Sequence, residues 1–209
     1  MQRGKFITIE GIEGVGKSTN IDYLAGIIEA NGYPVMKTRE PGGTPIAERI
    51  RNILKEHGDE PLPDVAELLL MFAARSINVN NAIQPALSNG TWVISDRFTD
   101  STRAYQGGGR GFPRDSIEWL AAFVHGDLQP DLTILLDAPV EIAMQRADRR
   151  GDPDRFEVER AEFFDRIRQS YLQLAESEPG RFVVVDCSLD LEAVQAAISE
   201  IAAALLITN

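Results

Sequence analysis

Residues 11–18 read Gly-Ile-Glu-Gly-Val-Gly-Lys-Ser and fit the spacing G-x-x-x-x-G-K-[ST]. Glycines there let backbone N–H groups surround a phosphate, and a helix that begins there adds the positive end of its dipole. Lys17 can neutralise the β- and γ-phosphates of a nucleotide, and the Ser18 hydroxyl can bind Mg²⁺. The segment predicts a nucleotide site; a glycine-rich turn without a ligand is the alternative. The residues expected to bind the nucleotide are Gly11, Ile12, Glu13, Gly14, Val15, Gly16, Lys17, Ser18 and Thr19.

Glu13 is an unusual residue for a loop of this kind, because a triphosphate would repel its carboxylate. Two interpretations are open. The side chain either turns away to solvent or accepts a hydrogen bond from another group, such as a sugar hydroxyl. The sequence by itself does not decide between these two orientations.

Arginine is concentrated between positions 146 and 160, in a chain that is otherwise acidic. The arginines are Arg146, Arg149, Arg150, Arg155 and Arg160. Acidic residues are interspersed with them, so a solvated helix face with i,i+4 ion pairs is one interpretation. Gly151 and Pro153 would interrupt a helix there, as a hinge requires. We therefore predict a mobile lid at about 146–160 that closes over a transferring phosphate.

Charged pairs follow two predicted strands at the point where each strand ends. Asp96 and Arg97 follow the strand at 92–94, and Arg39 and Glu40 follow the strand at 34–38. The carboxyl ends of parallel strands point into the crevice where α/β proteins bind their ligands. Each pair has a structural ion pair as its alternative. Two such ends beside the phosphate loop favour recognition of a phosphate.

Short apolar strands alternate with helical patterns along the whole chain. The predicted strands are 6–9, 34–38, 92–94, 132–136 and 182–185. The predicted helices are 17–31, 45–56, 63–86 (broken or bent near Pro85), 113–124, 140–149, 158–176 and 191–206. This alternation indicates βαβ units and hence an α/β fold, with a parallel sheet covered by helices on both faces. No linker is long enough to mark a boundary, so we expect a single domain over 1–209.

The composition limits the possible classes of function. Lys and Arg number 21 and Asp and Glu 32, so the net charge of the 209-residue chain is −11, which argues against general nucleic-acid binding. The apolar stretches are too short for a membrane span, and the N-terminus does not fit a signal peptide. Cys187 is the single cysteine, which fits a cytoplasmic protein, and with two histidines it makes no metal cluster. A GTPase would need an [NT]-K-x-D segment, which is missing.

Residues 94–106 read Ile-Ser-Asp-Arg-Phe-Thr-Asp-Ser-Thr-Arg-Ala-Tyr-Gln and match the signature of thymidylate kinases. The stretches 39–44, 71–75 and 106–111 also resemble bacterial members, and the resemblance covers nearly the whole chain. It implies a three-layer P-loop kinase fold with a five-stranded sheet. It also implies transfer of a phosphoryl group from Mg·ATP to dTMP, which gives dTDP, and it implies a homodimer. The apolar residues 68–72 belong either to such an interface or to the core.

The resemblance assigns roles on the acceptor side of the site. Glu13 would accept the 3′-hydroxyl of dTMP, and Arg97 would bind the dTMP phosphate with Arg39 close by. Arg75 would reach the edge of the thymine. The aromatic residue that stacks on the base lies four residues before this arginine in many relatives, where this chain has Met71; we assign Phe72, three before. Further substrate contacts are expected from Ser101, Thr102, Tyr105 and Gln106. Thr102 and Gln106 are candidates for hydrogen bonds to the base, and Tyr105 would crowd the 2′ position of the sugar.

The donor side follows from the same resemblance. One class of the family carries an arginine at the position of Gly14, whereas this chain resembles the class whose lid supplies the charge. Arg155 is the candidate for that catalytic role beside Lys17 and Arg97, and Arg150 is the second candidate. Arg146 would lie against adenine. Asp96 would orient water bound to Mg²⁺, together with the Ser18 ligand.

Two rival functions remain at this point. Another nucleoside monophosphate kinase, acting on dUMP, UMP or CMP, would share the phosphate loop and the lid and differ in its base pocket. A nucleotide-dependent switch would bind ATP without transferring a phosphoryl group. Arg39, Arg75 and Arg97 speak against the switch, because they provide for a second phosphorylated ligand.

Overall fold

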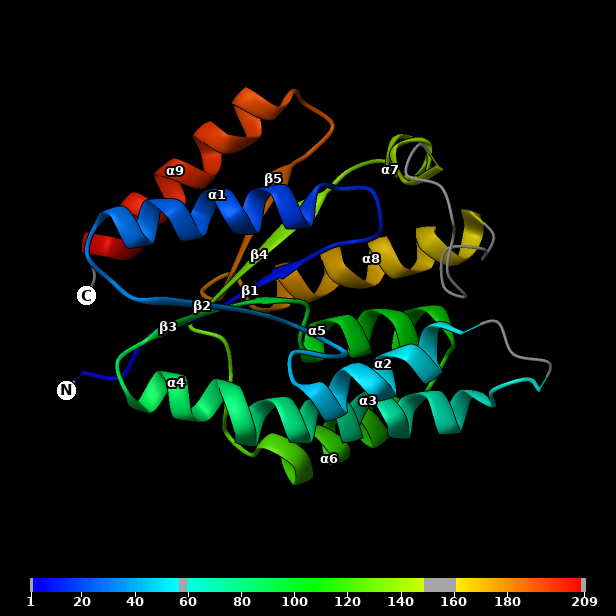
Figure 1. Ribbon diagram of the computed structural model, residues 1–209. Helices are drawn as coiled ribbons and strands as arrows, with labels where there is room; N and C mark the ends of the chain where they lie inside the picture. Colours follow the sequence, from blue (N-terminus) through cyan, green and yellow to red (C-terminus); the bar gives the residue numbers. More distant parts are fainter. Residues whose placement is uncertain (1, 57–59, 149–160, 208–209) are drawn as a thin grey trace.

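The computed structural model describes residues 2–56, 60–148 and 161–207. Within these ranges, five strands form one parallel sheet in the order β2-β3-β1-β4-β5 (Figure 1). The strands are β1 (Phe6–Glu10), β2 (Val35–Arg39), β3 (Trp92–Asp96), β4 (Leu132–Asp137) and β5 (Phe182–Asp186). The predicted parallel sheet is confirmed. Its central strand, β1, is the one that leads into the phosphate loop.

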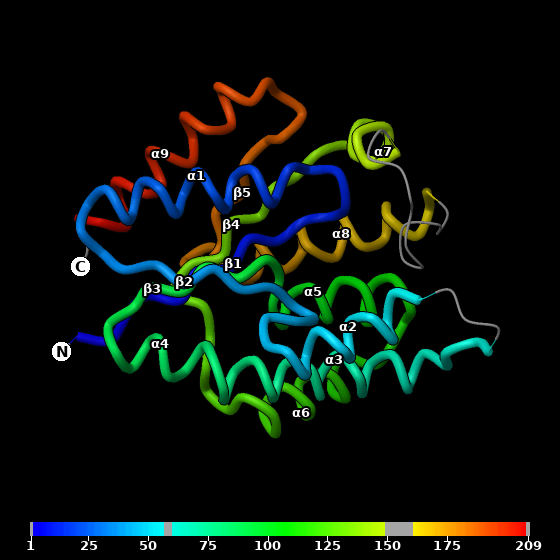
Figure 2. Tube along the Cα trace, viewed as in Figure 1, coloured from blue at the N-terminus to red at the C-terminus, as the bar shows by residue number. Residues whose placement is uncertain are grey.

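Helices cover both faces of this sheet, which confirms the predicted three-layer α/β fold (Figures 1 and 2). One face carries α1 (Lys17–Ala30) and α9 (Leu191–Ile207), which lie side by side. The other face carries α3 (Asp64–Asn78), η1 (Val79–Ile83), α4 (Gln84–Ser88), α5 (Thr99–Thr102), η2 (Arg103–Gly109), α6 (Arg114–His125) and α8 (Ala161–Ser177). Helix α2 (Pro45–Lys55) packs against α3, and α7 (Val140–Asp148) follows β4. None of the described helices is both long and apolar enough to cross a membrane.

Strand β1 is buried along its whole length, and its alternating side chains serve different purposes on the two faces of the sheet. Ile7 and Ile9 join the apolar cluster that includes α1 and α9. The intervening Thr8 and Glu10 point to the opposite face, where Glu10 accepts a hydrogen bond from the Ser101 hydroxyl at 2.6 Å. The period of two in a strand therefore carries a carboxylate into the interior, directly before the phosphate loop.

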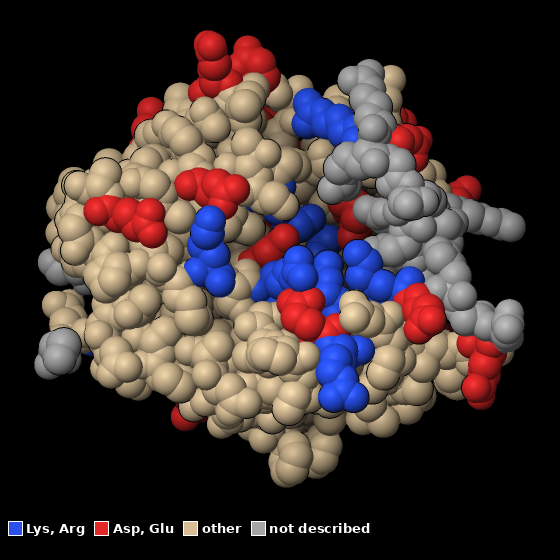
Figure 3. All heavy atoms as spheres, in the orientation of Figure 1, with Lys and Arg blue, Asp and Glu red and all other residues tan. Residues whose placement is uncertain are grey.

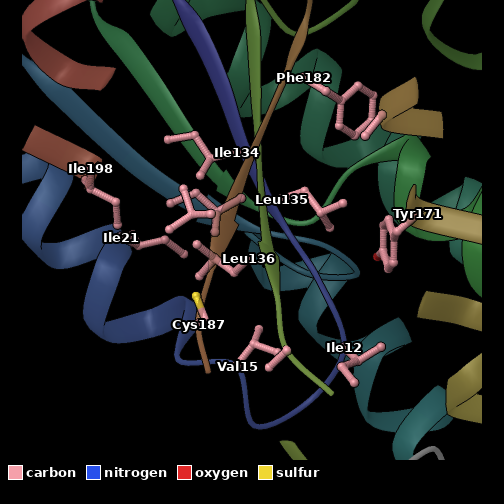
Figure 4. Close-up of a cluster of buried hydrophobic side chains, with 14 of the residues drawn as sticks. Ile12, Val15, Ile21, Ile134, Leu135, Leu136, Tyr171, Phe182, Cys187 and Ile198 are labelled. Carbon is pink, nitrogen blue, oxygen red and sulfur yellow. The ribbon is translucent and has the colours of Figure 1, made fainter. Parts of the chain in front are cut away.

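Strand β4 shows the same alternation with apolar residues. Figure 4 places Leu135 and Tyr171 on one side of β4, and Ile21 of α1 and Ile198 of α9 on the other. All four side chains are buried. Burial of a large apolar side chain stabilises a fold by roughly 1.5–3 kcal/mol, so both helical layers are attached firmly to the sheet.

The helical run from α5 through η2 was not expected from the sequence, because it ends in three consecutive glycines, which are poor helix formers. The close approach of α8 explains these glycines. A Cβ on Gly108 would lie 2.6 Å from the Cβ of Ser170, and one on Gly109 would lie 2.7 Å from the ring of Phe163. Contacts with α8 therefore override the low helix propensity of the segment.

The predicted helix at 63–86 is present as a helical run through α3, η1 and α4, but its irregular part precedes Pro85. The π-helical segment η1 (Val79–Ile83) lies immediately before Gln84 and Pro85. Proline has no N–H to donate, and its ring would clash with the carbonyl one turn earlier. A wider turn at this point accommodates the proline without ending the helical run.

His125, the last residue of α6, is buried behind the residues that follow β3. Its Nε2 lies 2.9 Å from the Thr99 hydroxyl, and its ring packs 5.0 Å from the ring of Phe98. Burial, and then the positive charges of Arg75 and Arg103, lower the pKa of His125 from 6.5 to about 4. The imidazole is therefore neutral at pH 7, and it serves to position Phe98.

The low pKa of His125 predicts how the free energy of unfolding depends on pH. The unfolded chain binds the proton more readily than the folded one, so the free energy of unfolding falls as the pH drops from 6.5 toward 4. When the pH falls from 7.5 to 5.5, we expect the free energy of unfolding of the wild-type protein to decrease by about 1 kcal/mol more than that of His125→Gln. The glutamine amide can still form a hydrogen bond to Thr99. Urea unfolding at both pH values measures this difference. Equal pH dependence of the two proteins would contradict the buried, neutral state.

Candidate active site

The phosphate loop wraps around its own lysine. Gly11, Gly14 and Gly16 have φ angles of +133°, +80° and +89°, values that residues other than glycine rarely adopt. The loop carbonyls of Gly11 and Ile12 accept hydrogen bonds from Lys17 Nζ at 3.1 and 2.8 Å. Burial and the charge of Arg97 lower the Lys17 pKa to about 8. An anionic phosphate beside this ammonium group would raise its pKa again.

The loop and its surroundings fit a polyphosphate with a divalent cation. A Cβ on Gly14 would lie 1.9 Å from the Ala143 carbonyl oxygen, so this backbone accepts no larger residue at position 14. The helix behind it begins without a side-chain cap, which leaves its first N–H groups for a ligand. Asp96 Oδ1 is buried and has no hydrogen-bond partner among the described residues, and Ser18 is exposed at the start of α1. Oxygen atoms of this kind are the ligands that Mg²⁺ prefers.

A cavity opens beside the phosphate loop, at the carboxyl ends of β1, β2 and β3. Figure 3 shows Lys and Arg side chains gathered around a hollow near the middle of this face, with carboxylates among them. The predicted site residues that line the cavity are Glu13, Arg75, Arg97, Ser101, Thr102, Tyr105 and Gln106. The structure therefore brings the predicted acceptor residues together, although they come from three separate segments of the chain.

The carboxylate of Glu13 turns into this cavity and not to solvent. It accepts hydrogen bonds from Arg97 Nη2 at 2.6 Å and from the Tyr105 hydroxyl at 2.5 Å. Burial opposes its charge, but Arg97 and then Lys17 hold the pKa of Glu13 below its usual value. The group is therefore ionised. Of the two orientations left open by the sequence, the hydrogen-bonded one is confirmed, and its donors are protein groups.

Arg75 is almost entirely buried, and most of its donors are in use. Its Nε donates to Glu40 at 2.6 Å, and its Nη2 donates to the Phe98 carbonyl at 3.1 Å and to the Thr102 hydroxyl at 3.0 Å. Its Nη1 is buried and has no partner in the part of the chain that the structure describes. Because a buried donor without a partner is costly, this atom marks a position where a ligand's acceptor would be stabilised.

The model of one protein family, described as thymidylate kinase, matches residues 9–198 of the chain. The chain belongs to the thymidylate kinase family. The thymidylate kinase of Chromohalobacter salexigens is 55% identical over 201 residues, which is 95% of each chain. That of Pseudomonas syringae pv. tomato is 53% identical over 203 residues, 97% of each chain. The crystal structure of the Ehrlichia chaffeensis thymidylate kinase superposes with a TM-score of 0.74 at 32% identity, over 95% of this chain and 98% of that one.

The family membership makes this chain an enzyme, a kinase of nucleotide biosynthesis. It is consistent with the acceptor cavity that adjoins the phosphate loop. A switch without transfer chemistry, the rival from another class, is therefore set aside. The structure also refines which residues line the cavity, in two places.

The first refinement concerns the residue that was expected to stack on a base. Phe72 does not line the cavity; it is buried between α3 and α6, against Ile117 and Ala121, with its ring 4.8 Å from Arg75 Cζ. The residue of this turn that lines the cavity is Met71. Residues four apart on a helix point in directions about 40° apart, whereas residues three apart differ by about 60° in the opposite sense. Met71 therefore shares the face of Arg75, and the assignment of Phe72 is corrected.

The second refinement concerns the basic residues near β2. Arg39 does not line the cavity, because its guanidinium is half-exposed and pairs with both oxygens of Glu48, at 3.0 and 2.8 Å. Arg51 and Lys55 of α2 line it instead, and Arg51 Nη1 donates to the Pro41 carbonyl at 2.8 Å. Sequence reasoning missed these two residues, although their spacing of four on a predicted helix puts both on one face.

Phe98 was also missed, although it directly follows Arg97 in the signature segment. Phe98 is among the residues that line the cavity, and its buried ring lies 5.3 Å from Arg75 Cζ. Gln106 is buried, and its amide donates to Glu67 at 2.8 Å. The aromatic wall of the cavity therefore comes from the segment after β3.

The expected lid falls largely outside the described residues. Arg150 and Arg155, the candidates for the lid charge, belong to that undescribed segment. Arg146 is described: it lies near the end of α7, and its Nη1 donates to the Cys187 carbonyl at 2.6 Å. This contact joins α7 to the residues after β5, on the phosphate-loop side of the sheet.

The phosphate loop yields a prediction with a matched control. In Gly14→Ala, the new methyl group collides with the Ala143 carbonyl at a positive φ, so the loop must move. We expect at least about a tenfold loss of affinity for Mg·ATP, measured by calorimetric titration. Gly26→Ala, in α1, meets no atom within 4 Å. It should keep that affinity and raise the free energy of unfolding by about 0.5–1 kcal/mol. Undiminished affinity in Gly14→Ala would refute this role of the loop.

Proposed function

We propose that this enzyme transfers the γ-phosphoryl group of ATP to the phosphate of dTMP, which gives dTDP, with Mg²⁺ as the required ion. The observation that carries the proposal is the cavity that adjoins the phosphate loop and is lined by the predicted acceptor residues. On its walls lie Arg97, the residue we expect to bind an acceptor phosphate, and Arg75, with a buried donor that lacks a partner among the described residues. The family membership supports the same reaction.

On the acceptor side, each group has a distinct task. Arg97 would bind the phosphate of dTMP, and Arg51 and Lys55 add positive charge to the same cavity. Glu13 would accept the 3′-hydroxyl, because its ionised carboxylate lines the cavity and, beyond the two hydrogen bonds that it accepts there, has lone pairs for another. Tyr105 lies against Glu13 and would crowd a 2′-hydroxyl. This arrangement favours a deoxyribose monophosphate.

The base would lie between Arg75 and an apolar wall. Arg75 Nη1 supplies a hydrogen-bond donor for a carbonyl of the base, with Thr102 and Gln106 close by. Met71 and Phe98 supply apolar surface next to this arginine. A methyl group on the pyrimidine gains from such surface, so the pocket suits thymine better than uracil.

On the donor side, the loop N–H groups and Lys17 would hold the phosphates of ATP, and Ser18 and Asp96 would hold Mg²⁺ or its bound water. The bound ion would neutralise charge on the β- and γ-phosphates. The acceptor phosphate is already a competent nucleophile, so no strong general base is required. Positioning and charge stabilisation account for catalysis of this kind. Arg155, Arg150 and Arg146 keep their proposed roles at the lid and the adenine.

We also propose that the enzyme forms a homodimer. Three neighbouring helices expose large apolar side chains: Ile46 and Ile53 on α2, Val65 and Leu69 on α3, and Trp119 and Phe123 on α6. The rings of Trp119 and Phe123 stack in parallel at 5.4 Å while both remain exposed. Apolar surface on adjacent elements is typical of protein interfaces. Of the stretch 68–72, Leu68 and Phe72 belong to the core, and Leu69 belongs to this exposed surface.

A coupled assay of ADP release tests the proposed reaction. With Mg·ATP and a panel of dTMP, dUMP, UMP, CMP and AMP, we expect kcat/KM to be highest for dTMP. The margin over dUMP should be about tenfold or more, because one methyl group in an apolar pocket is worth roughly 1–3 kcal/mol. A preference for another monophosphate would overturn the assignments of the base pocket. ATP binding without any turnover would instead favour a nucleotide-dependent switch.

The residue beside the base is tested by two truncations. Met71→Ala should raise the KM for dTMP about fivefold and change the free energy of unfolding by less than about 1 kcal/mol, because this side chain lines a cavity. Phe72→Ala removes a buried ring and should destabilise the protein by about 3–4 kcal/mol. Steady-state kinetics and urea unfolding measure both effects. A larger KM effect at Phe72 than at Met71 would restore the choice made from the sequence.

A further inference from the structure

Arg97 has an unusual backbone conformation that neighbouring groups hold in place. Its φ angle is +73°, and among the described residues no other residue except glycine has a positive φ. Such a conformation is strained for a residue that carries a side chain, and it persists where the surroundings impose it. The Arg97 N–H donates to the Ile9 carbonyl at 3.1 Å, and its carbonyl accepts a hydrogen bond from the Ser95 hydroxyl at 2.7 Å. The next N–H, of Phe98, donates to Glu10 at 2.7 Å.

The same Glu10 carboxylate is also linked to the guanidinium group of Arg97, through the hydroxyls of Ser101 and Tyr171. Its second oxygen lies 2.6 Å from the Ser101 hydroxyl and 2.9 Å from the Tyr171 hydroxyl. Arg97 Nη1 donates to both of these hydroxyls at 3.2 Å. The two hydroxyls also lie 2.7 Å from each other, so one of them donates to the other, which in turn donates to Glu10, while both accept from Arg97. One buried carboxylate therefore fixes both the peptide that follows Arg97 and the position of its guanidinium group.

The two Nη atoms of Arg97 are held on opposite sides. Nη2 donates to Glu13 and to the Tyr105 hydroxyl, which belong to the cavity described above. Nη1 is held by Ser101 and by Tyr171, a residue of α8 that lies 74 positions later in the sequence than Arg97. Tyr171 does not line the cavity. Burial and the charge of Glu10 raise its pKa well above the usual value, so its hydroxyl stays protonated as a donor.

We propose that Tyr171 is a positioning residue for the acceptor phosphate: together with Ser101 and Glu10, it holds the guanidinium of Arg97 in the orientation that binds this phosphate. The proposal rests on the proposed function, since it requires that Arg97 binds the phosphate of dTMP. The Tyr171 hydroxyl touches no substrate. Its removal frees one side of Arg97, so the effect should appear only with ligands that carry the phosphate.

Binding of dTMP and of thymidine, which lacks the phosphate, tests this proposal. Calorimetric titration of Tyr171→Phe should show a Kd for dTMP raised about five- to tenfold, the effect expected when a hydrogen bond to a charged group is lost. The Kd for thymidine should change by less than about twofold. Tyr23→Phe is the matched control, because the Tyr23 hydroxyl also bonds to a serine, Ser199, at 2.9 Å, between α1 and α9. It should leave both Kd values unchanged.

The other outcomes are equally informative. Equal weakening of dTMP and thymidine would show that Tyr171 only supports the pocket as a whole, and unchanged binding of both would remove it from the network; either result overturns the proposal. Urea unfolding of Tyr171→Phe covers the case that this variant folds poorly, because the two Kd values are then compared under conditions in which it is folded. Wild-type protein that bound dTMP no more tightly than thymidine would overturn the phosphate role of Arg97 itself.

Discussion

Two arginines beside the carboxyl edge of the sheet are wholly or largely withdrawn from water, and each is paired with a carboxylate that follows a strand. Arg75 is paired with Glu40 after β2, and Arg97 with Glu13 after β1. A buried charge is tolerated only where a counter-charge and hydrogen bonds replace its hydration, and loss of one partner of such a pair typically costs about 3–5 kcal/mol. These pairs therefore link the position of the cavity to the order of the strands.

The pairing also explains how an acidic protein can hold anionic ligands. The chain has a net charge of −11, yet its cavity is lined by Arg51, Lys55, Arg75 and Arg97. The carboxylates beside two of these cations fix their geometry and keep them compatible with burial. An incoming phosphate meets donors that are already oriented, so little reorganisation is needed when it binds. Local placement of charge, and not the overall balance, determines what this surface recognises.

Much of this arrangement could be predicted because it depends on short-range patterns. The phosphate loop has a fixed spacing, and the alternation of strands and helices leads to a parallel sheet whose carboxyl ends meet at one edge. Other features depend on contacts between distant segments. The helical run through α5 and η2 forms against α8, which passes so close to Gly108 and Gly109 that larger residues would not fit. No local propensity indicates this.

The amino-acid sequence by itself determined the fold class, the phosphate loop and the convergence of the segments that follow β1, β2 and β3, because each follows from local spacing and from the common edge of a parallel sheet. Only the tertiary structure decided which side chain of a turn faces the cavity, since Met71 and Phe72 are adjacent and differ only in direction around the helix axis. It also decided that Arg51 lines the cavity while Arg39 pairs with Glu48, and that Tyr171 reaches Arg97. Which side chains line the cavity and which pair with each other depends on the distances between charged groups and rings from separate segments. Those distances are set only when the chain is folded.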